Sequence, residues 1–477
     1  MDVLKWALLA LIILVAVATA SHALLYKRDP RAALAWIAVC LLYPLLGPVL
    51  YVLFGVNRVR TRAKKLGHRW QFFLPVVFER PEHQGSAALS SLDVPEEVKA
   101  IARISDAVTR RPLVGGNGIE FLHNGEQVYP SMLEAIEGAE RTLFLSTYIF
   151  ETNDTGLRFI DALARAARRG VDVRVIIDGV GQWYSIPRAG TLLEKQGVRV
   201  ARFLPPSLIP PKLRINLRNH RKILVADGTI GFIGGMNIGD RHLTERFENP
   251  SRVVDAHFRL TGPVVTQIEK VFLEDWGFIT GEHTVPSQAL AIETDRIICR
   301  AIIDGPDEDL DKLSTILLGA VSAAHQRISI MTPYFLPSRE LIAALQSAAL
   351  RGVEVTILLP AKNNLPFVHW ATRKMLWELL EWGIRVFYQP PPFVHTKLFV
   401  VDDLYGLIGS ANIDPRSLRL NFELAVEVFD SQFAKILSEH IQRSLERSLE
   451  ISLEDLESRQ LPGRIRDALA WLFSPYL

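Results

Sequence analysis

The chain contains twice a run in which histidine, lysine and aspartate stand at the same spacing: His220-Arg221-Lys222-Ile223-Leu224-Val225-Ala226-Asp227 and His395-Thr396-Lys397-Leu398-Phe399-Val400-Val401-Asp402. Four apolar residues typical of a strand separate lysine from aspartate in each run. Alternate residues of a strand share a face, so each histidine and lysine are expected to project together into one cleft. A single His-x-Lys is ordinarily part of a half-buried strand, but two copies at matching positions of a repeat indicate a functional site.

A Gly-x-x-Asn segment follows each run: Gly234-Gly235-Met236-Asn237 and Gly409-Ser410-Ala411-Asn412. A neutral imidazole beside an ammonium group suits a phosphate substrate, because the nitrogen can attack phosphorus while lysine and asparagine hold the nonbridging oxygens. The candidate catalytic residues are therefore His220, Lys222, His395 and Lys397, and the candidate substrate ligands are Asn237 and Asn412. Asp227 and Asp402 complete the catalytic pattern, although fixing the turn after the strand is the favoured role for both.

The residues around these motifs repeat over roughly 180 positions, which indicates duplicated domains rather than a solenoid. Helical and strand patterns alternate in the same order in the two copies, over 132–139, 142–149, 157–169 and 171–177 and over 312–325, 328–331, 341–350 and 353–359. The joints Arg169-Gly170-Val171-Asp172-Val173 and Arg351-Gly352-Val353-Glu354-Val355 correspond almost letter for letter. We predict an α/β fold of two duplicated domains, 111–285 and 286–477, each a mixed β-sheet flanked by helices, with one shared active site.

The N-terminal part of the chain, residues 1–69, has the pattern of a membrane anchor. Trp6–Tyr26 and Ala32–Val56 carry no charge, and each is long enough to cross a hydrocarbon core of about 30 Å. Together they predict a two-helix transmembrane hairpin; the alternative for the first run is a cleaved signal peptide, with Ala18-Thr19-Ala20 as the cleavage site. The basic flank Arg58–Arg69 places the catalytic domains on the cytoplasmic side by the positive-inside rule.

Charge and cysteine content exclude several classes of protein. The net charge is +2, of which residues 1–69 contribute +8, so residues 70–477 are acidic. An acidic body argues against nucleic acid as a partner, because that affinity comes from neutralised phosphates. The two cysteines exclude a disulfide scaffold and a Cys-rich metal site, and no His/Asp/Glu grouping has metal-ligand spacing. Residues 70–110 are expected to form a linker, and Arg464–Leu477 an amphipathic C-terminal helix that docks on the body or lies on the bilayer.

The doubled motif resembles the double His-x-Lys-x4-Asp signature of the phospholipase D superfamily. The run Gly409–Glu423 and the N-terminal hairpin are similar to those of bacterial cardiolipin synthases, and the resemblance covers essentially the whole chain. It implies two phospholipase D-like domains and a two-step transfer through a phosphohistidine that needs no metal and no cofactor. His220 would be the nucleophile and His395 the acid, or the reverse.

The resemblance also assigns supporting residues. It implies an acidic residue behind each histidine, matching Asp255 and Glu423, which would fix the tautomer and stabilise the imidazolium. This chain departs from the family pattern at Gly235, where the second copy has Ser410, so a serine contact to phosphate would come from one half only.

The function implied is that of a cardiolipin synthase, which transfers a phosphatidyl group from one phosphatidylglycerol to another and releases glycerol. Phosphatidylglycerol and other anionic membrane lipids would be the partners. The location implied is the bacterial inner (cytoplasmic) membrane, crossed more than once. The alternatives are a membrane-anchored hydrolase that uses water, a transferase for another alcohol, a scaffold without catalysis, and a nuclease.

Overall fold

The computed structural model describes residues 2–27, 30–55, 95–109, 111–208, 211–212, 217–246, 248–286, 295–306 and 309–474. The chain divides into two compact units, Met1–Arg69 and Trp70–Leu477. The basic flank and most of the expected linker lie outside the described residues.

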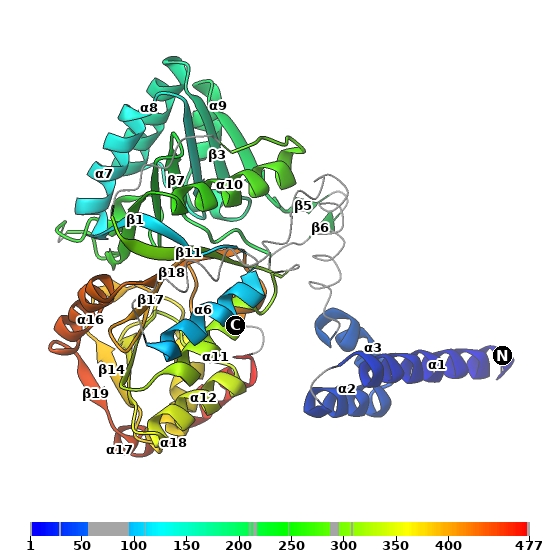
Figure 1. Ribbon diagram of the computed structural model, residues 1–477. Coiled ribbons are helices and arrows are strands. Elements are labelled where there is room, and N and C mark those ends of the chain that lie inside the picture. Colours follow the sequence, from blue (N-terminus) through cyan, green and yellow to red (C-terminus); the bar gives the residue numbers. More distant parts are fainter. Residues whose placement is uncertain are drawn as a thin grey trace. The chain divides into compact units, whose positions relative to one another are not determined.

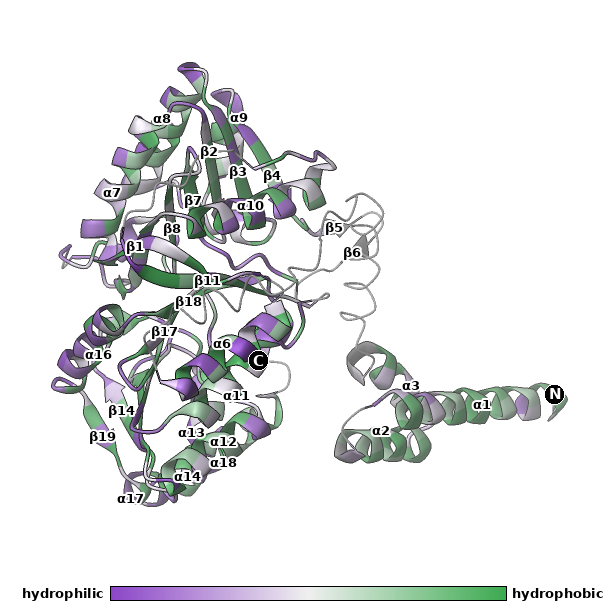
Figure 2. Ribbon diagram, in the orientation of Figure 1, coloured by the Kyte–Doolittle hydropathy of each residue, from purple (hydrophilic) through white to green (hydrophobic). Residues whose placement is uncertain are grey.

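The N-terminal unit consists of α1 (Asp2–Tyr26), α2 (Pro30–Leu42), α3 (Leu46–Leu50) and a π-helical turn (Tyr51–Gly55). In the described part of the chain, one helix, Val3–Tyr26, is long and apolar enough to cross a membrane, and Figure 2 shows α1 apolar along most of its length. The second apolar run is divided because Pro44 has no amide hydrogen to continue α2. Helix α2 packs on α1 through Ala20, Ala23 and Cys40. The structure therefore contains two paired helices, and a second membrane span stays a prediction.

The larger unit is built on one long mixed sheet. Among the described residues the sheet has 15 strands, in the order β19-β14-β13-β12-β16-β17-β18-β11-β1-β10-β8-β7-β2-β3-β4. The order of the strands from β11 to β14 mirrors that from β1 to β4, as a duplication requires. Strands β1 and β11 pair antiparallel where the halves meet (Figure 1). The predicted α/β fold with mixed sheets is confirmed.

The first half of this unit extends from β1 to α10. Its elements are β1 (Val114–His123), α7 (Asn124–Gly138), β2 (Thr142–Thr147), α8 (Asp154–Arg168), β3 (Asp172–Asp178), a 3-10 turn (Gly181–Tyr184), α9 (Ala189–Lys195), β4 (Arg199–Phe203), β5 (Ser207–Leu208), β6 (Pro211–Lys212), β7 (Ile223–Ala226), β8 (Ile230–Gly234), a second 3-10 turn (Asp240–His242), β9 (Val253–Val254), β10 (Ala256–Thr261) and α10 (Val264–Thr280).

The second half repeats this order and adds C-terminal helices. Its elements are β11 (Ile297–Asp304), α11 (Lys312–Ala323), β12 (Arg327–Met331), α12 (Arg339–Leu350), β13 (Glu354–Pro360), α13 (Pro366–Met375), α14 (Trp377–Leu380), β14 (Arg385–Gln389), β15 (Phe393–Val394), β16 (Leu398–Val401), β17 (Tyr405–Gly409), α15 (Pro415–Arg419), β18 (Glu423–Phe429), α16 (Ser431–Leu445), β19 (Leu449–Ile451), α17 (Leu453–Glu457) and α18 (Leu461–Leu472).

The repeated Arg-Gly-Val joints end α8 and α12 in the same way. Gly170 and Gly352 adopt left-handed backbone (φ +94° and +89°), which favours glycine after a helix. Arg169 donates to three carbonyl oxygens at the end of α7, and Arg351 donates to three near the end of α11. The near-identical letters therefore mark one structural device used twice.

Two segments extend the second half beyond the repeat. The expected linker contains a helix, α6 (Glu96–Thr109), whose buried face joins the core of the second half. Its Ser105 hydroxyl donates to Glu427 at 2.7 Å, so the end of the expected linker belongs to the folded body. At the C-terminus, α18 packs on α13 with Ala470 buried, as the docking alternative predicted.

Candidate active site

The two histidines of the repeated motif meet between the halves. His220 precedes β7 and His395 precedes β16, and their ring centroids lie 6.5 Å apart with the planes at 81°. Both side chains are nearly buried, with 13% and 11% exposed. Rings this close can contact the same phosphate group from two directions.

Each histidine is hydrogen-bonded to a carboxylate of the opposite half. His220 Nδ1 lies 3.0 Å from Glu423 Oε2, and His395 Nδ1 lies 2.8 Å from Asp255 Oδ2. The backbone crosses over in the same way, since the His220 amide donates to the Phe422 carbonyl and the His395 amide donates to Val254. With Nδ1 engaged, Nε2 of each ring is the nitrogen left for chemistry.

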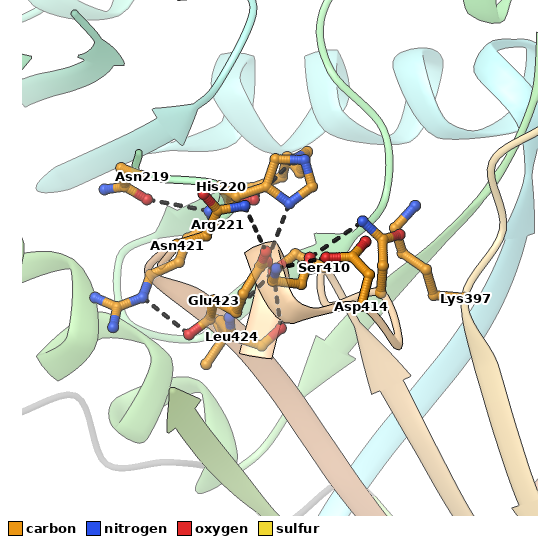
Figure 3. Close-up of polar contacts among 12 residues, drawn as sticks. Asn219, His220, Arg221, Lys397, Ser410, Asp414, Asn421, Glu423 and Leu424 are labelled. Carbon is orange, nitrogen blue, oxygen red and sulfur yellow. Dashed lines mark hydrogen bonds and ion pairs between the residues drawn. The ribbon is translucent and has the colours of Figure 1, made fainter. Parts of the chain in front are cut away.

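A buried polar network supports His220 from below. Asn219 Nδ2 and Arg221 Nη1 donate to the two oxygens of Asp275 at 3.0 and 2.6 Å, and Arg218 donates to Asp178 at 3.1 Å. Arg221 also donates to the Glu423 carbonyl at 3.1 Å, so it connects both halves (Figure 3). Asn219, Arg221, Asp178 and Asp275 were not predicted from the sequence as part of the site. The second half has Val394 and Thr396 at the matching positions, so this support is not repeated there.

The lysines of the motif lie beside the histidines. Lys222 Nζ donates to the His220 carbonyl at 2.7 Å, and Lys397 Nζ donates to the His395 carbonyl. Burial lowers the pKa of Lys222 to about 7 and that of Lys397 to about 8. A bound phosphate would favour the charged ammonium forms, so the site is suited to an anionic substrate.

Burial also sets the protonation of the histidine–carboxylate pairs. It lowers the pKa of both imidazoles, that of His395 to about 3, although the facing carboxylates act in the opposite direction. Burial alone would raise the pKa values of Asp255 and Glu423, but the facing histidines and lysines lower both below the ordinary range. Both carboxylates are therefore ionised and the free imidazoles are predominantly neutral.

The serine of the second copy supports a carboxylate rather than facing the space between the rings. Ser410 Oγ donates to Glu423 Oε2 at 2.5 Å and accepts from the Leu424 amide at 3.1 Å (Figure 3). In the first copy a Cβ on Gly235 would come within 2.5 Å of Asp255 Oδ1. Ser410 thus lies beside the longer acid, Glu423, and Gly235 lies beside the shorter one, Asp255. The Ser410 hydroxyl is engaged in holding Glu423, and its expected contact with phosphate stays a prediction.

The two asparagines have different environments. Asn237 Oδ1 accepts from the Ile149 amide at 3.0 Å. Asn412 Nδ2 donates to Ser417 Oγ at 3.1 Å, and Asn412 Oδ1 has no hydrogen-bond partner among the residues that the structure describes. A half-turn of this amide would let Oδ1 accept from the Ser417 hydroxyl and free Nδ2 to donate to a phosphate oxygen.

The aspartates of the motif have structural surroundings. The Asp227 carboxylate accepts from the amides of Glu140, Arg141 and Thr142. Asp402 accepts from three amides in the same way, those of His325, Gln326 and Arg327. Both residues follow the ends of β7 and β16, away from the histidines that precede these strands. The carboxylate bonds agree with the turn-fixing role that the sequence favours for both residues, and a direct part of either in the chemistry stays a prediction.

The ring of a tyrosine contacts the ring of each histidine, and neither tyrosine was predicted from the sequence as a site residue. The ring of Tyr148 meets His220 edge-on at 5.5 Å between centroids, and that of Tyr334 meets His395 at 6.1 Å. The tyrosines lie in the equivalent turns after β2 and β12 but one position apart in the repeat, since the Thr147 hydroxyl donates to the Ile149 carbonyl and the Thr332 hydroxyl to the Tyr334 carbonyl. Burial raises the pKa of Tyr148 to about 12 and raises that of Tyr334 further, which keeps both hydroxyls protonated as donors.

Metal ligands were not expected, and within the described ranges no group of three or more His, Cys, Asp or Glu side chains is arranged to hold a metal ion.

Comparison with known proteins identifies the family. The family described as "Cardiolipin synthase, PLD-like domain" matches residues 132–276 and 317–445, the two copies of the repeat. The chain belongs to the cardiolipin synthase family. A second family, described as "Phospholipase_D-nuclease N-terminal", matches residues 7–55.

Individual relatives agree with this membership of the cardiolipin synthase family. The chain is 32% identical to cardiolipin synthase A of Pseudomonas putida strain KT2440, over 98% of this chain and 97% of the relative. It is 32% identical to the major cardiolipin synthase ClsA of Bacillus subtilis strain 168, over 94% and 95%. A solved structure, phosphatidylserine synthase from Haemophilus influenzae, matches with a TM-score of 0.58 at 17% identity, covering 79% of this chain and all of that one, and shows the shared fold.

Proposed function

We propose that the chain transfers a phosphatidyl group between two phosphatidylglycerol molecules and so produces cardiolipin and glycerol. The observation that carries the proposal is the crossed pair of histidine–carboxylate bonds, 3.0 and 2.8 Å long, around one space. Such an arrangement supplies one nucleophile and one acid to the same phosphate. Relatives named cardiolipin synthase over nearly the full length support this choice of reaction.

The first step replaces glycerol by the enzyme. Nε2 of His220 attacks phosphorus, the bond from phosphorus to the glycerol oxygen breaks, and His395 gives its proton to that oxygen. Negative phosphate charge stabilises a protonated imidazole, so substrate binding opposes the effect of burial on the His395 pKa. Lys222 and Lys397 stabilise the charge that develops on the nonbridging oxygens.

The second step reverses the first with a new alcohol. The glycerol hydroxyl of a second phosphatidylglycerol gives its proton to His395 and attacks phosphorus, and the bond from phosphorus to His220 breaks. Asp255 and Glu423 hold the rings by Nδ1 through both steps. Because the two halves are nearly symmetrical, the roles of the two histidines can be exchanged without changing the balance of atoms.

The test is incubation of the purified chain with phosphatidylglycerol alone, followed by separation of the lipid products. Cardiolipin with an equal amount of glycerol is expected. Phosphatidic acid would instead support hydrolysis, and no product at all would support a scaffold without catalysis. His220→Ala, which removes the nucleophile, is the control for contaminating activity.

We also propose that the protein is a multi-pass inner-membrane protein of a bacterium with its catalytic domains in the cytoplasm. The apolar helix Val3–Tyr26 and the basic flank Arg58–Arg69 support this orientation. Leu350→Cys gives a labelling site that is 69% exposed, whereas the native Cys40 and Cys299 are buried. A membrane-impermeant maleimide should label this variant only after the cells are opened, and labelling of intact spheroplasts would reverse the orientation.

A further inference from the structure

Five exposed apolar side chains lie in two segments that follow equivalent strands of the two halves, β3 and β13. The loop after β3 exposes 57% of Trp183, 55% of Tyr184 and 93% of Ile186. After β13, the equivalent strand of the second half, 45% of Leu365 is exposed at the end of the loop and 55% of Phe367 in the first turn of α13. We call these five residues the apolar rim. Proteins whose surface contacts only water rarely expose this much apolar area in equivalent segments of two repeats, so the exposure indicates a binding surface.

Both loops of the apolar rim adjoin the active site. The ring of Tyr184 lies 6.4 Å from that of Tyr148, which in turn contacts the His220 ring. In the second loop Asn364 accepts a hydrogen bond of 2.7 Å from the Tyr334 hydroxyl, and the Tyr334 ring contacts His395. Each segment thus adjoins a tyrosine whose ring contacts His220 or His395.

The chemistry of the rim points to one occupant. The Arg188 guanidinium lies 5.5 Å from the centre of the Trp183 ring, and Lys362 is exposed in the second loop. Aromatic side chains beside cations are typical of surfaces that rest at the boundary between headgroups and acyl chains of an anionic bilayer. A lipid phosphate can then reach the histidines while its acyl chains stay in the membrane.

We propose that the apolar rim inserts into the surface of an anionic phospholipid bilayer and seats the active site over the lipid headgroups. This inference rests on the proposed function, since a bilayer substrate is what gives the rim its use. It names the loops that deliver the substrate, which the family membership does not.

The position of the rim can be measured with a spin label on the full chain in vesicles of phosphatidylglycerol and phosphatidylcholine. Ile186→Cys carries the label, and the buried Cys40 and Cys299 do not compete for it. The matched control is Leu350→Cys, which is also exposed but lies before β13, at the other end of that strand from the rim. Relaxation by oxygen, which concentrates in the bilayer, is compared with relaxation by a water-soluble nickel complex.

The label at position 186 is expected to relax more with oxygen than with nickel, and the label at position 350 more with nickel. Greater nickel access at position 186 would overturn the proposal. Shielding from both reagents, as in contact with a second copy of the chain, would overturn it as well. This readout needs no turnover, so it stands apart from the test of the proposed function.

A kinetic comparison gives the second arm. The double variant Trp183→Ser, Ile186→Ser should turn over vesicle phosphatidylglycerol about tenfold more slowly, because it loses apolar area that the bilayer would bury. On monomeric short-chain phosphatidylglycerol it should match the wild type within about twofold, since no docking is needed. Equal loss on both substrates, or no loss on vesicles, would contradict the docking role.

Discussion

His220 is held by Glu423 and His395 by Asp255, so the chemistry of each half depends on a carboxylate from the other. Crossing makes the pair inseparable: a half that folded alone would present its histidine without the group that orients it. The duplicated chain therefore has one site rather than two. The pseudo-symmetry also leaves a chemical question, which is which ring acts as the acid.

Replacing each carboxylate by its amide separates the two roles. The Asp255 charge raises the pKa of His395, so Asp255→Asn should lower that pKa. If His395 is the acid, it then loses its proton at lower pH, and the alkaline limb of the kcat profile should move to lower pH with kcat reduced about 10²- to 10⁴-fold.

Glu423→Gln is the matched variant, because the Glu423 charge raises the pKa of the nucleophile His220. A lower pKa makes the neutral ring available at lower pH, so the acid limb should move down instead. The opposite assignment of limbs would exchange the roles of the histidines, and two unshifted profiles would refute the positioning role of both acids.

The Gly235/Ser410 difference gives a steric prediction. A methyl group on Gly235 would approach the Asp255 oxygens to within 2.5 Å, so Gly235→Ala should displace the carboxylate and lower kcat about tenfold or more. Ser410→Ala removes the hydrogen bond that the hydroxyl donates to the Glu423 carboxylate. A hydrogen bond to a charged group typically contributes about 1.5–3 kcal/mol to stability. Steady-state kinetics check both, with circular dichroism as the control for folding. Wild-type kcat in Gly235→Ala would show that Asp255 can move without consequence.

The histidines and lysines could be selected from the sequence, because residues two apart in an extended segment share a face. The repeat shows the His-x-Lys pattern twice. The sequence did not show that the carboxylates cross over, since spacing along the chain says nothing about which half supplies a neighbour. Tyr148 and Tyr334 were missed because an aromatic residue after a strand is common, and the two tyrosines stand one position apart in the repeat, so the duplication does not pair them.

Among the elements, β7 ends at Ala226, and the next residue, Asp227, has a left-handed backbone with φ +52°. Asp227→Ala removes bonds to three amides and puts alanine in a conformation that it disfavours, so it should lower the free energy of unfolding by about 1–3 kcal/mol. Asparagine adopts this backbone readily and keeps one oxygen acceptor. The free energy of unfolding of Asp227→Asn should therefore lie between that of the alanine variant and that of the wild type. Thermal unfolding measures the order, and kcat should stay within about threefold of wild type. A loss of kcat without a loss of stability would instead support a direct part of Asp227 in the chemistry.

Helices and strands of the repeat were predictable because their apolar periods are regular and glycine marks their ends, as at Gly170 and Gly352. Two elements were not. Helix α6 was assigned to a linker because it follows a polar run, although Val98, Ile101 and Ala102 are buried at helical spacing. The break in the second apolar run after Leu42 was not predicted, because hydropathy does not register the missing amide of Pro44.

In the whole molecule, the two halves share one continuous sheet, and a buried charge network attaches helix α6 to that sheet. Beyond the β1 and β11 pairing, Arg300 on β11 donates to Glu427 at 2.6 Å and to the Ala102 carbonyl at 3.0 Å. This network ties α6 to the centre of the sheet. Such pairings bring together residues that are far apart in the chain. The duplication could be recognised from the sequence because it is a pattern along the chain. The joint between the copies could not, because it depends on long-range contacts.

The central claim is that one histidine of the pair becomes covalently bound to phosphorus before the acceptor arrives. Rapid quenching of the full chain with phosphatidylglycerol labelled at phosphorus tests this directly. We expect an acid-labile, alkali-stable label on a single histidine, His220, which His220→Ala abolishes. Label on His395 instead would exchange the two roles while keeping the mechanism. Absence of label under conditions of turnover, together with inversion of configuration at a chiral phosphorus, would contradict the phosphohistidine.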